Sequence, residues 1–196
     1  MRVIAGQYRR RILKSLPGVE IRPTADRLRE TLFNVLSAGS PEALAQSTWI
    51  DLYAGTGAIG IEALSRGARM VYFVEVSKAA ADLIAANLKS LGIVSGFQIV
   101  KLDAGKALRQ LEEAGRGADF VFLDPPYSMQ DEYAKTLAAL AQSKLLNERS
   151  VVIAEHEKRF DPGESFGQLR CYRTLVQGDA ALSFYRRRAY GLTTIK

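Results

Sequence analysis

The chain has 196 residues, of which 47% are hydrophobic and 24% charged, which are the proportions of one globular domain and exclude a disordered or fibrous protein. The net charge is +6, and residues 1–30 alone hold eight basic and three acidic side chains, so nearly all the excess lies at one end. A polyanionic partner such as nucleic acid explains this asymmetry, and a solvated basic face is the alternative.

The single cysteine has no cysteine or histidine at metal-ligand spacing, and no apolar run is long enough for a signal peptide or a membrane helix. We therefore expect a cytoplasmic protein without membrane contact and without a metal site.

Residues 1–23 predict a basic β-hairpin extension, and residues 24–190 predict the main domain. Alternating segments at 2–5 and 10–16 are joined across Gly6-Gln7-Tyr8, which is typical of a hairpin. From Thr24, a plausible N-cap, apolar residues recur on one stripe of a helix.

From residue 48 onward, short apolar strands alternate with helical segments. Strands are predicted at 49–53, 70–76, 97–102, 119–123 and 151–155, and helices at 58–66 and 78–91 end before Gly67 and Gly92. Strands at 168–177 and 181–187 lie too close together for a helix and form a hairpin. The pattern predicts an α/β fold with a doubly wound, Rossmann-like sheet that is mainly parallel and ends in an antiparallel hairpin.

A glycine-rich loop joins the first of these strands to the next helix, with the sequence Asp51-Leu52-Tyr53-Ala54-Gly55-Thr56-Gly57-Ala58-Ile59-Gly60. Its glycines fit a dinucleotide fingerprint, and Glu75 stands about 20 residues beyond Gly55, where a ribose-binding acid belongs. A nicotinamide cofactor is therefore one candidate. Asp51 would repel its pyrophosphate but attract the ammonium and sulfonium groups of S-adenosylmethionine, which favours the latter cofactor.

Acidic residues also follow the third and fourth strands, at Asp103 and Asp124. Open parallel sheets bind ligands at the carboxyl ends of their strands, so Asp51, Glu75, Asp103 and Asp124 are expected to converge on one crevice. Any one of them alone could be a loop cap.

The run Phe120-Val121-Phe122-Leu123-Asp124-Pro125-Pro126-Tyr127 delivers an acid, two prolines and an aromatic ring to the end of a buried strand. Prolines fix φ and donate no hydrogen bond, so the carbonyl groups here are rigid acceptors. The Asp124 carboxylate and the Pro125 carbonyl could accept both hydrogens of an exocyclic amine, and Tyr127 could stack on the base. This arrangement predicts methyl transfer to a nucleobase amine.

The Asp-Pro-Pro-Tyr run resembles the motif of amino methyltransferases. More narrowly, residues 22–34 and 51–67 together with Asp124–Tyr127 resemble the bacterial 16S ribosomal RNA guanine N2-methyltransferases, and the match extends over nearly the whole chain. The resemblance implies transfer of a methyl group from S-adenosylmethionine to the N2 amine of a guanine in small-subunit ribosomal RNA, either free or within an assembling subunit.

Carried over by position, the resemblance gives the methionine end of the cofactor to Asp51, Ala54, Gly55 and Gly57, its ribose to Glu75 and its adenine to Asp103. The target base would be held by the catalytic residues Asp124, Pro125 and Tyr127. We expect Arg9, Arg10, Arg11, Arg22, Arg27 and Arg29 to bind RNA phosphates. The chain departs from the family pattern at Arg10, where glycine is usual.

Two other functions are open to this sequence. A DNA adenine or cytosine amino methyltransferase would use the same four-residue motif, although no large target-recognition insert is visible. A nucleic-acid-binding protein with an inactive cofactor fold is the third, and the intact Asp51, Glu75 and Asp124 argue against it.

Overall fold

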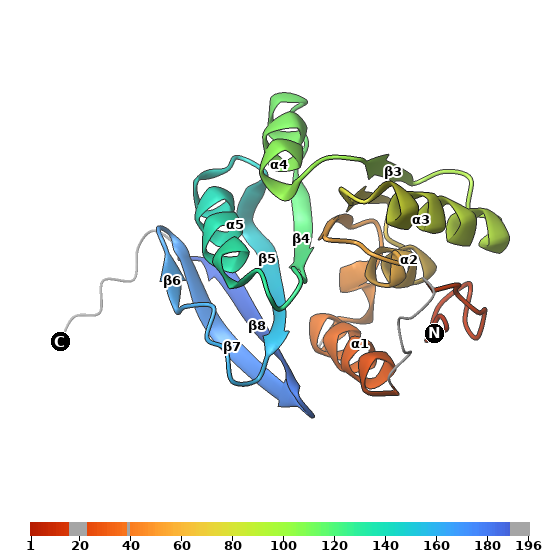
Figure 1. The fold of residues 1–196 in the computed structure, drawn as a ribbon, viewed down its shortest axis with the longest axis horizontal. Helices are drawn as coiled ribbons and strands as arrows, with labels where there is room; N and C mark the ends of the chain where they lie inside the picture. Colours follow the sequence, from red (N-terminus) through yellow and green to blue (C-terminus); the bar gives the residue numbers. More distant parts are fainter. Residues whose placement is uncertain (16–22, 39, 189–196) are drawn as a thin grey trace.

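The structure, a computed structural model, describes residues 1–15, 23–38 and 40–188. Its centre is an eight-stranded sheet with the strand order β3-β2-β1-β4-β5-β8-β7-β6 (Figure 1). The strands are β1 (Thr48–Leu52), β2 (Met70–Val74), β3 (Phe97–Val100), β4 (Ala118–Leu123), β5 (Leu146–Glu157), β6 (Ser165–Phe166), β7 (Leu169–Gln177) and β8 (Ala180–Arg187).

The first five strands of the chain pair in parallel, and β8, β7 and β6 extend the sheet in antiparallel fashion. This confirms the predicted doubly wound sheet with an antiparallel hairpin at its end. The strand order reverses between β1 and β4, and the loops after these strands therefore diverge to opposite sides of the sheet. A ligand crevice is expected at this switch point.

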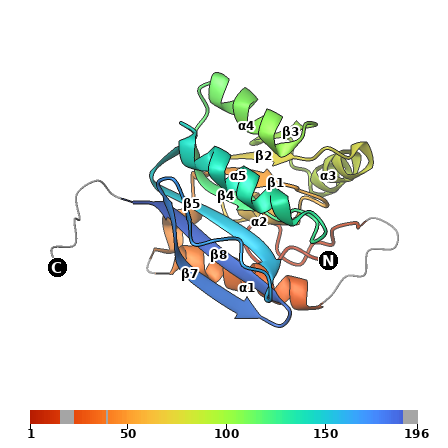
Figure 2. The same ribbon diagram turned by 60° about the vertical axis from the view of Figure 1, so that its left-hand side comes forward.

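Helices cover both faces of the parallel strands (Figure 2). One face packs against α1 (Pro23–Ser37), α2 (Ala58–Ser65) and α3 (Lys78–Leu91), and the other packs against α4 (Ala104–Glu113) and α5 (Gln130–Gln142). Because strands buried on both faces carry apolar side chains in both directions, β1 is buried along its whole length. Gly67 and Gly92 have positive φ values of 95° and 73°, as predicted for residues that end α2 and α3.

Several elements differ from the sequence-based prediction. The amino-terminal segments pair through one antiparallel bridge, between Arg2 and Ile12, and not as two strands. Helix α1 begins at Pro23, one residue before the predicted cap, since proline suits the first turn of a helix. Helices α4 and α5 and a short 3-10 helix at Pro41–Leu44 are not among the elements predicted above.

Residues 1–15, here called the amino-terminal arm, are held against α2 by polar contacts with the arm backbone. The buried Glu62 carboxylate accepts hydrogen bonds from the backbone N–H groups of Ile4 and Ala5, at 2.7 and 3.0 Å. Ser65 accepts from the N–H of Tyr8 through its hydroxyl and from that of Gln7 through its carbonyl. The arm is thus fixed largely by its main chain, and the side chains of Arg2, Arg9 and Arg10 are exposed.

Helices that combine the length and apolarity needed to cross a membrane are absent from the described part of the chain.

Candidate active site

A cleft of about 520 Å³ lies at the carboxyl ends of β1, β2 and β4. Six residues of the predicted cofactor and base sites line it together: Gly55, Glu75, Asp103, Asp124, Pro125 and Tyr127. Its walls are completed by mostly apolar side chains and two further polar ones, namely Val74, Val76, Leu102, Ala104, Pro126, Met129, Tyr53 and Glu132. The cleft therefore brings three of the six predicted cofactor residues together with Asp124, Pro125 and Tyr127, whereas Asp51, Ala54 and Gly57 do not line it.

Glu75 holds the glycine-rich loop as well as facing the cleft. Its Oε2 accepts a hydrogen bond from the backbone N–H of Gly55 at 2.9 Å, and its Oε1 accepts one from the N–H of Ser77 at 2.8 Å. Gly55 has a φ of 55°, and a Cβ placed there would point into open space, with only the Tyr53 carbonyl at 3.9 Å. The loop backbone can therefore come close to a ligand, while each Glu75 oxygen retains a second lone pair for it.

Asp51 lies beneath this loop, with 2% of its surface exposed, and does not line the cleft itself. Its Oδ2 accepts a hydrogen bond from the backbone N–H of Gly60 at 3.0 Å, near the start of α2. Burial, reinforced by the neighbouring Asp124 and Glu75 carboxylates, raises the pKa of Asp51 to about 8. A cationic ligand at the loop would favour the ionised form of Asp51 and would lower this pKa.

Asp103 caps helix α4. One of its carboxylate oxygens accepts a hydrogen bond from the backbone N–H of Lys106 at 2.9 Å, and the other pairs with the ammonium group of the same residue at 3.1 Å. The hydrogen bond from this backbone N–H lowers the pKa of Asp103, so the group stays ionised. It lines the cleft beside Leu102 and Ala104, and its predicted contact with the adenine stays a prediction.

The Asp-Pro-Pro-Tyr run forms the opposite wall of the cleft. Asp124 is partly buried, and this burial raises its pKa to about 7. Pro125 is buried, whereas the Tyr127 side chain is 42% exposed at the rim next to Met129. A flat ligand can therefore reach the acceptor groups while lying against the exposed ring.

Glu155, which the sequence analysis did not select, is a neighbour of Asp124. Leu123 of β4 pairs in register with Ala154 of β5, so the following residues, Asp124 and Glu155, stand side by side on parallel strands. Burial and then the charge of Asp124 raise the pKa of Glu155, while Arg29 of α1 opposes this shift. The signal that could have found Glu155 is its place as one more acid at a strand end.

Alternation along β4 and β5 places both carboxylates on the same face of the sheet. Phe122 and Ile153, two residues before them, pack in the core beneath α1, α2 and α3. Glu155 is partly exposed, and its side chain makes no hydrogen bond or ion pair with the described residues. The pair therefore offers several carboxylate acceptors at one point.

The six predicted RNA-binding arginines have different environments. Arg29 is buried, with 4% of its surface exposed; it pairs with Asp26 at 3.1 Å and donates to the Arg2 carbonyl. It cannot reach a phosphate without leaving the core, so we remove it from the predicted interface. Arg11 donates to the Ser90 carbonyl at 2.9 Å. The other residues of this group are Arg9, Arg10 and Arg27, which are exposed, and Arg22, which lies outside the described residues.

Arg10 has a positive φ of 69°, a conformation that favours glycine, which is the usual residue at this position of the family pattern. A side chain in this left-handed conformation is strained, and glycine relieves the strain. The substitution of the usual glycine by arginine therefore adds a positive charge at a strained turn of the arm.

The chain is similar in sequence to the members of one family. The model of the family described as conserved hypothetical protein 95 matches residues 1–186. Ribosomal RNA small subunit methyltransferase D of Haemophilus influenzae is 35% identical over 81% of this chain and 79% of its own length. The Escherichia coli K12 protein of the same name is 30% identical, over 97% of this chain and 92% of its own length.

Solved structures share the fold. A hypothetical protein of Thermus thermophilus superposes with a TM-score of 0.78 at 26% identity and covers 94% of this chain and 98% of its own. An S-adenosylmethionine-dependent methyltransferase of Agrobacterium tumefaciens has a TM-score of 0.58 at 20% identity, over 71% of this chain and 46% of its own, and shows the fold alone. From these matches, the chain belongs to the family of conserved hypothetical protein 95, among the ribosomal RNA small subunit methyltransferase D proteins.

Proposed function

We propose that this protein transfers a methyl group from S-adenosylmethionine to the N2 amine of a guanine in small-subunit ribosomal RNA. The names of its relatives support the class of reaction and of substrate. The single observation that carries guanine over adenine is the pair of adjoining carboxylates, Asp124 just after β4 and Glu155 near the end of β5.

The residues around the cleft fit S-adenosylmethionine, which supplies the methyl group when bound. Val74, Leu102 and Ala104 offer an apolar wall for the adenine, and Glu75 offers acceptors for the ribose hydroxyl groups. Within the described residues, no basic side chain lines this cleft, whereas Asp51, Glu75 and Asp124 lie in or beneath it. This potential favours a cationic methionine end and disfavours the pyrophosphate of a dinucleotide.

The target base is held by acceptors that match its hydrogens. Guanine presents three N–H hydrogens along one edge of the base, two at N2 and one at N1. The Asp124 carboxylate and the Pro125 carbonyl take the N2 hydrogens, Glu155 takes the N1 hydrogen, and the exposed Tyr127 ring stacks on the flipped base. Each transfer replaces one N2 hydrogen by methyl and releases a proton, which Asp124, with a pKa of about 7, can accept.

The central experiment incubates the protein with methyl-labelled S-adenosylmethionine and small-subunit ribosomal RNA, supplied both as free RNA and as assembling particles. Nuclease digestion and mass spectrometry should find N2-methylguanosine at one position. Label in N6-methyladenosine, or label on DNA and not on RNA, would support the amino methyltransferase alternative in place of this proposal.

The role of Glu155 is tested with 2-aminopurine at the methylated position. This base retains the 2-amine, but its N1 is an acceptor and would face the Glu155 carboxylate. An unpaired acceptor contact costs about 1–3 kcal/mol, so we expect the parent protein to methylate 2-aminopurine about tenfold or more slowly than guanine. In Glu155→Gln the amide can donate to N1, and the discrimination should shrink.

Glu157→Gln is the matched control, because Glu157 is exposed two residues further along the same strand. A Glu155→Gln protein that keeps the parent ratio of guanine to 2-aminopurine rates would remove Glu155 from base recognition.

A further inference from the structure

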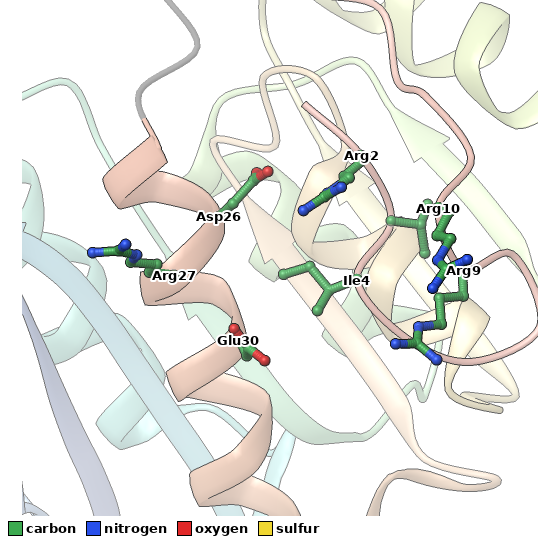
Figure 3. Close-up of a pocket in the computed structure, with 8 residues that line it drawn as sticks. Arg2, Ile4, Arg9, Arg10, Asp26, Arg27 and Glu30 are labelled. Atoms are coloured by element: carbon green, nitrogen blue, oxygen red, sulfur yellow. The ribbon is translucent and has the colours of Figure 1, made fainter.

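A second pocket, of about 490 Å³, separates the amino-terminal arm from helix α1 (Figure 3). Its arm side is lined by Arg2, Val3, Ile4, Arg9 and Arg10, and its helix side by Asp26, Arg27 and Glu30. In Figure 3, Asp26 and Glu30 lie on the helix side of the pocket, opposite Arg2 and Ile4 of the arm, whereas the Arg27 side chain points away from the arm.

Both walls of this pocket are held in place. The arm is fixed to α2 by the hydrogen bonds from Ile4 and Ala5 to Glu62. Helix α1 is tied to the arm by Arg29, which donates to the Arg2 carbonyl and lies 4.0 Å from Glu62. The pocket therefore lies between two segments that the fold holds in fixed positions.

The charges that line the pocket are not used within the described structure. The side chains of Arg2, Arg9, Arg10 and Glu30 have no hydrogen bond or ion pair with any described residue, and Asp26 pairs with Arg29 on its own helix. Three guanidinium groups and one carboxylate thus face the same space without neutralising one another. A ligand with an anionic part and a hydrogen-bond-donating part would satisfy both.

Two contacts link the surroundings of this pocket with those of the active site. Met1 contacts the glycine-rich loop, because the Thr56 hydroxyl donates to its sulfur at 3.6 Å. Arg29, which donates to the carbonyl of Arg2 in the pocket wall, is the basic residue whose charge lowers the pKa of Glu155. An RNA that places one nucleotide in the cleft can therefore place a nearby nucleotide between the arm and α1.

We propose that this pocket binds one unpaired guanine nucleotide of the substrate RNA close to the methylated base, an inference that rests on the proposed function. Its phosphate lies against Arg9 and Arg10, and its N1 and N2 hydrogens are accepted by Glu30. Guanine fits because, among the four bases, it alone presents two adjacent donors to one carboxylate. Ile4 supplies an apolar contact for the ring.

The test uses small-subunit RNA transcripts in which a few guanines are replaced at random by inosine, which lacks the 2-amine. Protein-bound and unbound transcripts are separated and the inosine positions mapped. The parent protein should exclude inosine at one unpaired guanine besides the methylated one, by about fivefold or more. Glu30→Gln should lose that exclusion and keep the exclusion at the methylated guanine.

Glu148→Gln serves as the matched control, because Glu148 is exposed in the first part of β5, away from the carboxyl ends of the strands. Arg9→Ala should weaken binding of all transcripts without changing the inosine pattern. An unchanged pattern in Glu30→Gln would overturn this inference alone. Absence of any guanine methylation by the parent protein would instead overturn the proposed function.

Discussion

At the scale of single residues, the site is dominated by acids that the fold keeps close together. Asp51, Glu75, Asp124 and Glu155 lie in or just after the last residues of four neighbouring strands, and the pKa values of Asp51, Asp124 and Glu155 are raised. Burial is the largest cause in each case, and mutual repulsion adds to it for Asp51 and Glu155. Such a cluster holds protons until a cation or a set of N–H donors replaces them.

This leads to a pH dependence of cofactor binding. Free protein binds a proton at Asp51 below pH about 8, and a bound sulfonium would favour the ionised carboxylate, so binding should release a proton. Affinity for S-adenosylmethionine should therefore rise with pH between about 6 and 8, by at most about tenfold per unit. Calorimetry in buffers of different ionisation enthalpy measures the proton release directly.

Asp51→Asn is the control for this prediction. It keeps an acceptor for the Gly60 N–H but cannot titrate. Any proton released by the amine of the cofactor is then the same in both proteins. Equal proton release by both proteins would exclude Asp51 as the linked group.

Arg10 gives a prediction in which stability and function move in opposite directions. Replacing it by glycine relieves the positive φ and should raise the free energy of unfolding by about 0.5–1 kcal/mol, after the entropy of glycine is counted. Thermal unfolding should shift upward by roughly 1–4 °C. RNA affinity should fall, because the guanidinium group is lost. A stable Arg10→Gly protein with unchanged RNA affinity would show that Arg10 does not contact phosphate.

At the scale of elements, the regular strands and the acids at their ends were predictable, because apolar runs and strand-end chemistry are local signals. Helix α3 occurs at the predicted residues, 78–91. Helix α4 was within reach as well, since Ala104, Ala107, Leu108 and Leu111 follow a helical stripe. The docking of the arm was not predictable, because it rests on partners far away in the sequence, such as Glu62 and Asn87.

Asn87 is the clearest example of such a non-local role. Its side chain is fully buried; it accepts from the N–H of Lys14 at 2.8 Å and donates to the carbonyls of Lys14 and Thr56, at 3.1 and 3.0 Å. One amide on α3 therefore connects the arm to the glycine-rich loop. If RNA binds to the arm and the cofactor to the loop as proposed, this amide would couple the two binding events.

We predict that Asn87→Ala lowers the free energy of unfolding by about 1–3 kcal/mol, since it leaves buried backbone groups unpaired. It should also weaken the binding of S-adenosylmethionine, although Asn87 does not line the cleft. Hydrogen exchange should speed up in the arm and at residues 54–57 together. Asn34→Ala, at an exposed position of α1, is the control, and protection lost in the arm alone would contradict the coupling.

At the scale of the whole molecule, the basic arm runs from the loop after β1 to the last turns of α2 and α3, where Gln7 and Tyr8 contact Ser65 and Arg11 contacts Ser90. The arm contacts the loop after β1, and α1 covers the face on which Asp124 and Glu155 lie. The opposite end of the strands, where β4 and β5 begin, also carries exposed basic residues, namely Arg116, Lys144 and Arg149. These three positive charges allow a test of whether the position of the basic residues or the net charge of the protein attracts the RNA.

Two triple variants separate these effects, because each lowers the net charge of +6 by the same three units. In the first, Arg2, Arg9 and Arg10 are replaced by alanine, except that Arg10 becomes glycine to suit its backbone. In the second, Arg116, Lys144 and Arg149 become alanine. Each lost phosphate contact flattens the slope of log affinity against log salt concentration by roughly 0.7–0.9, so the first variant should lose about 2–3 units of slope.

The second variant should keep nearly the parent slope, since its charges lie where β4 and β5 begin and salt screens charges farther than about 8–10 Å from the RNA. Methylation at saturating RNA should fall much less than affinity in the first variant, because Asp124, Pro125 and Tyr127 are intact. Circular dichroism checks that both proteins fold. Equal loss of slope in the two variants would mean that net charge, and not the arm, attracts the RNA.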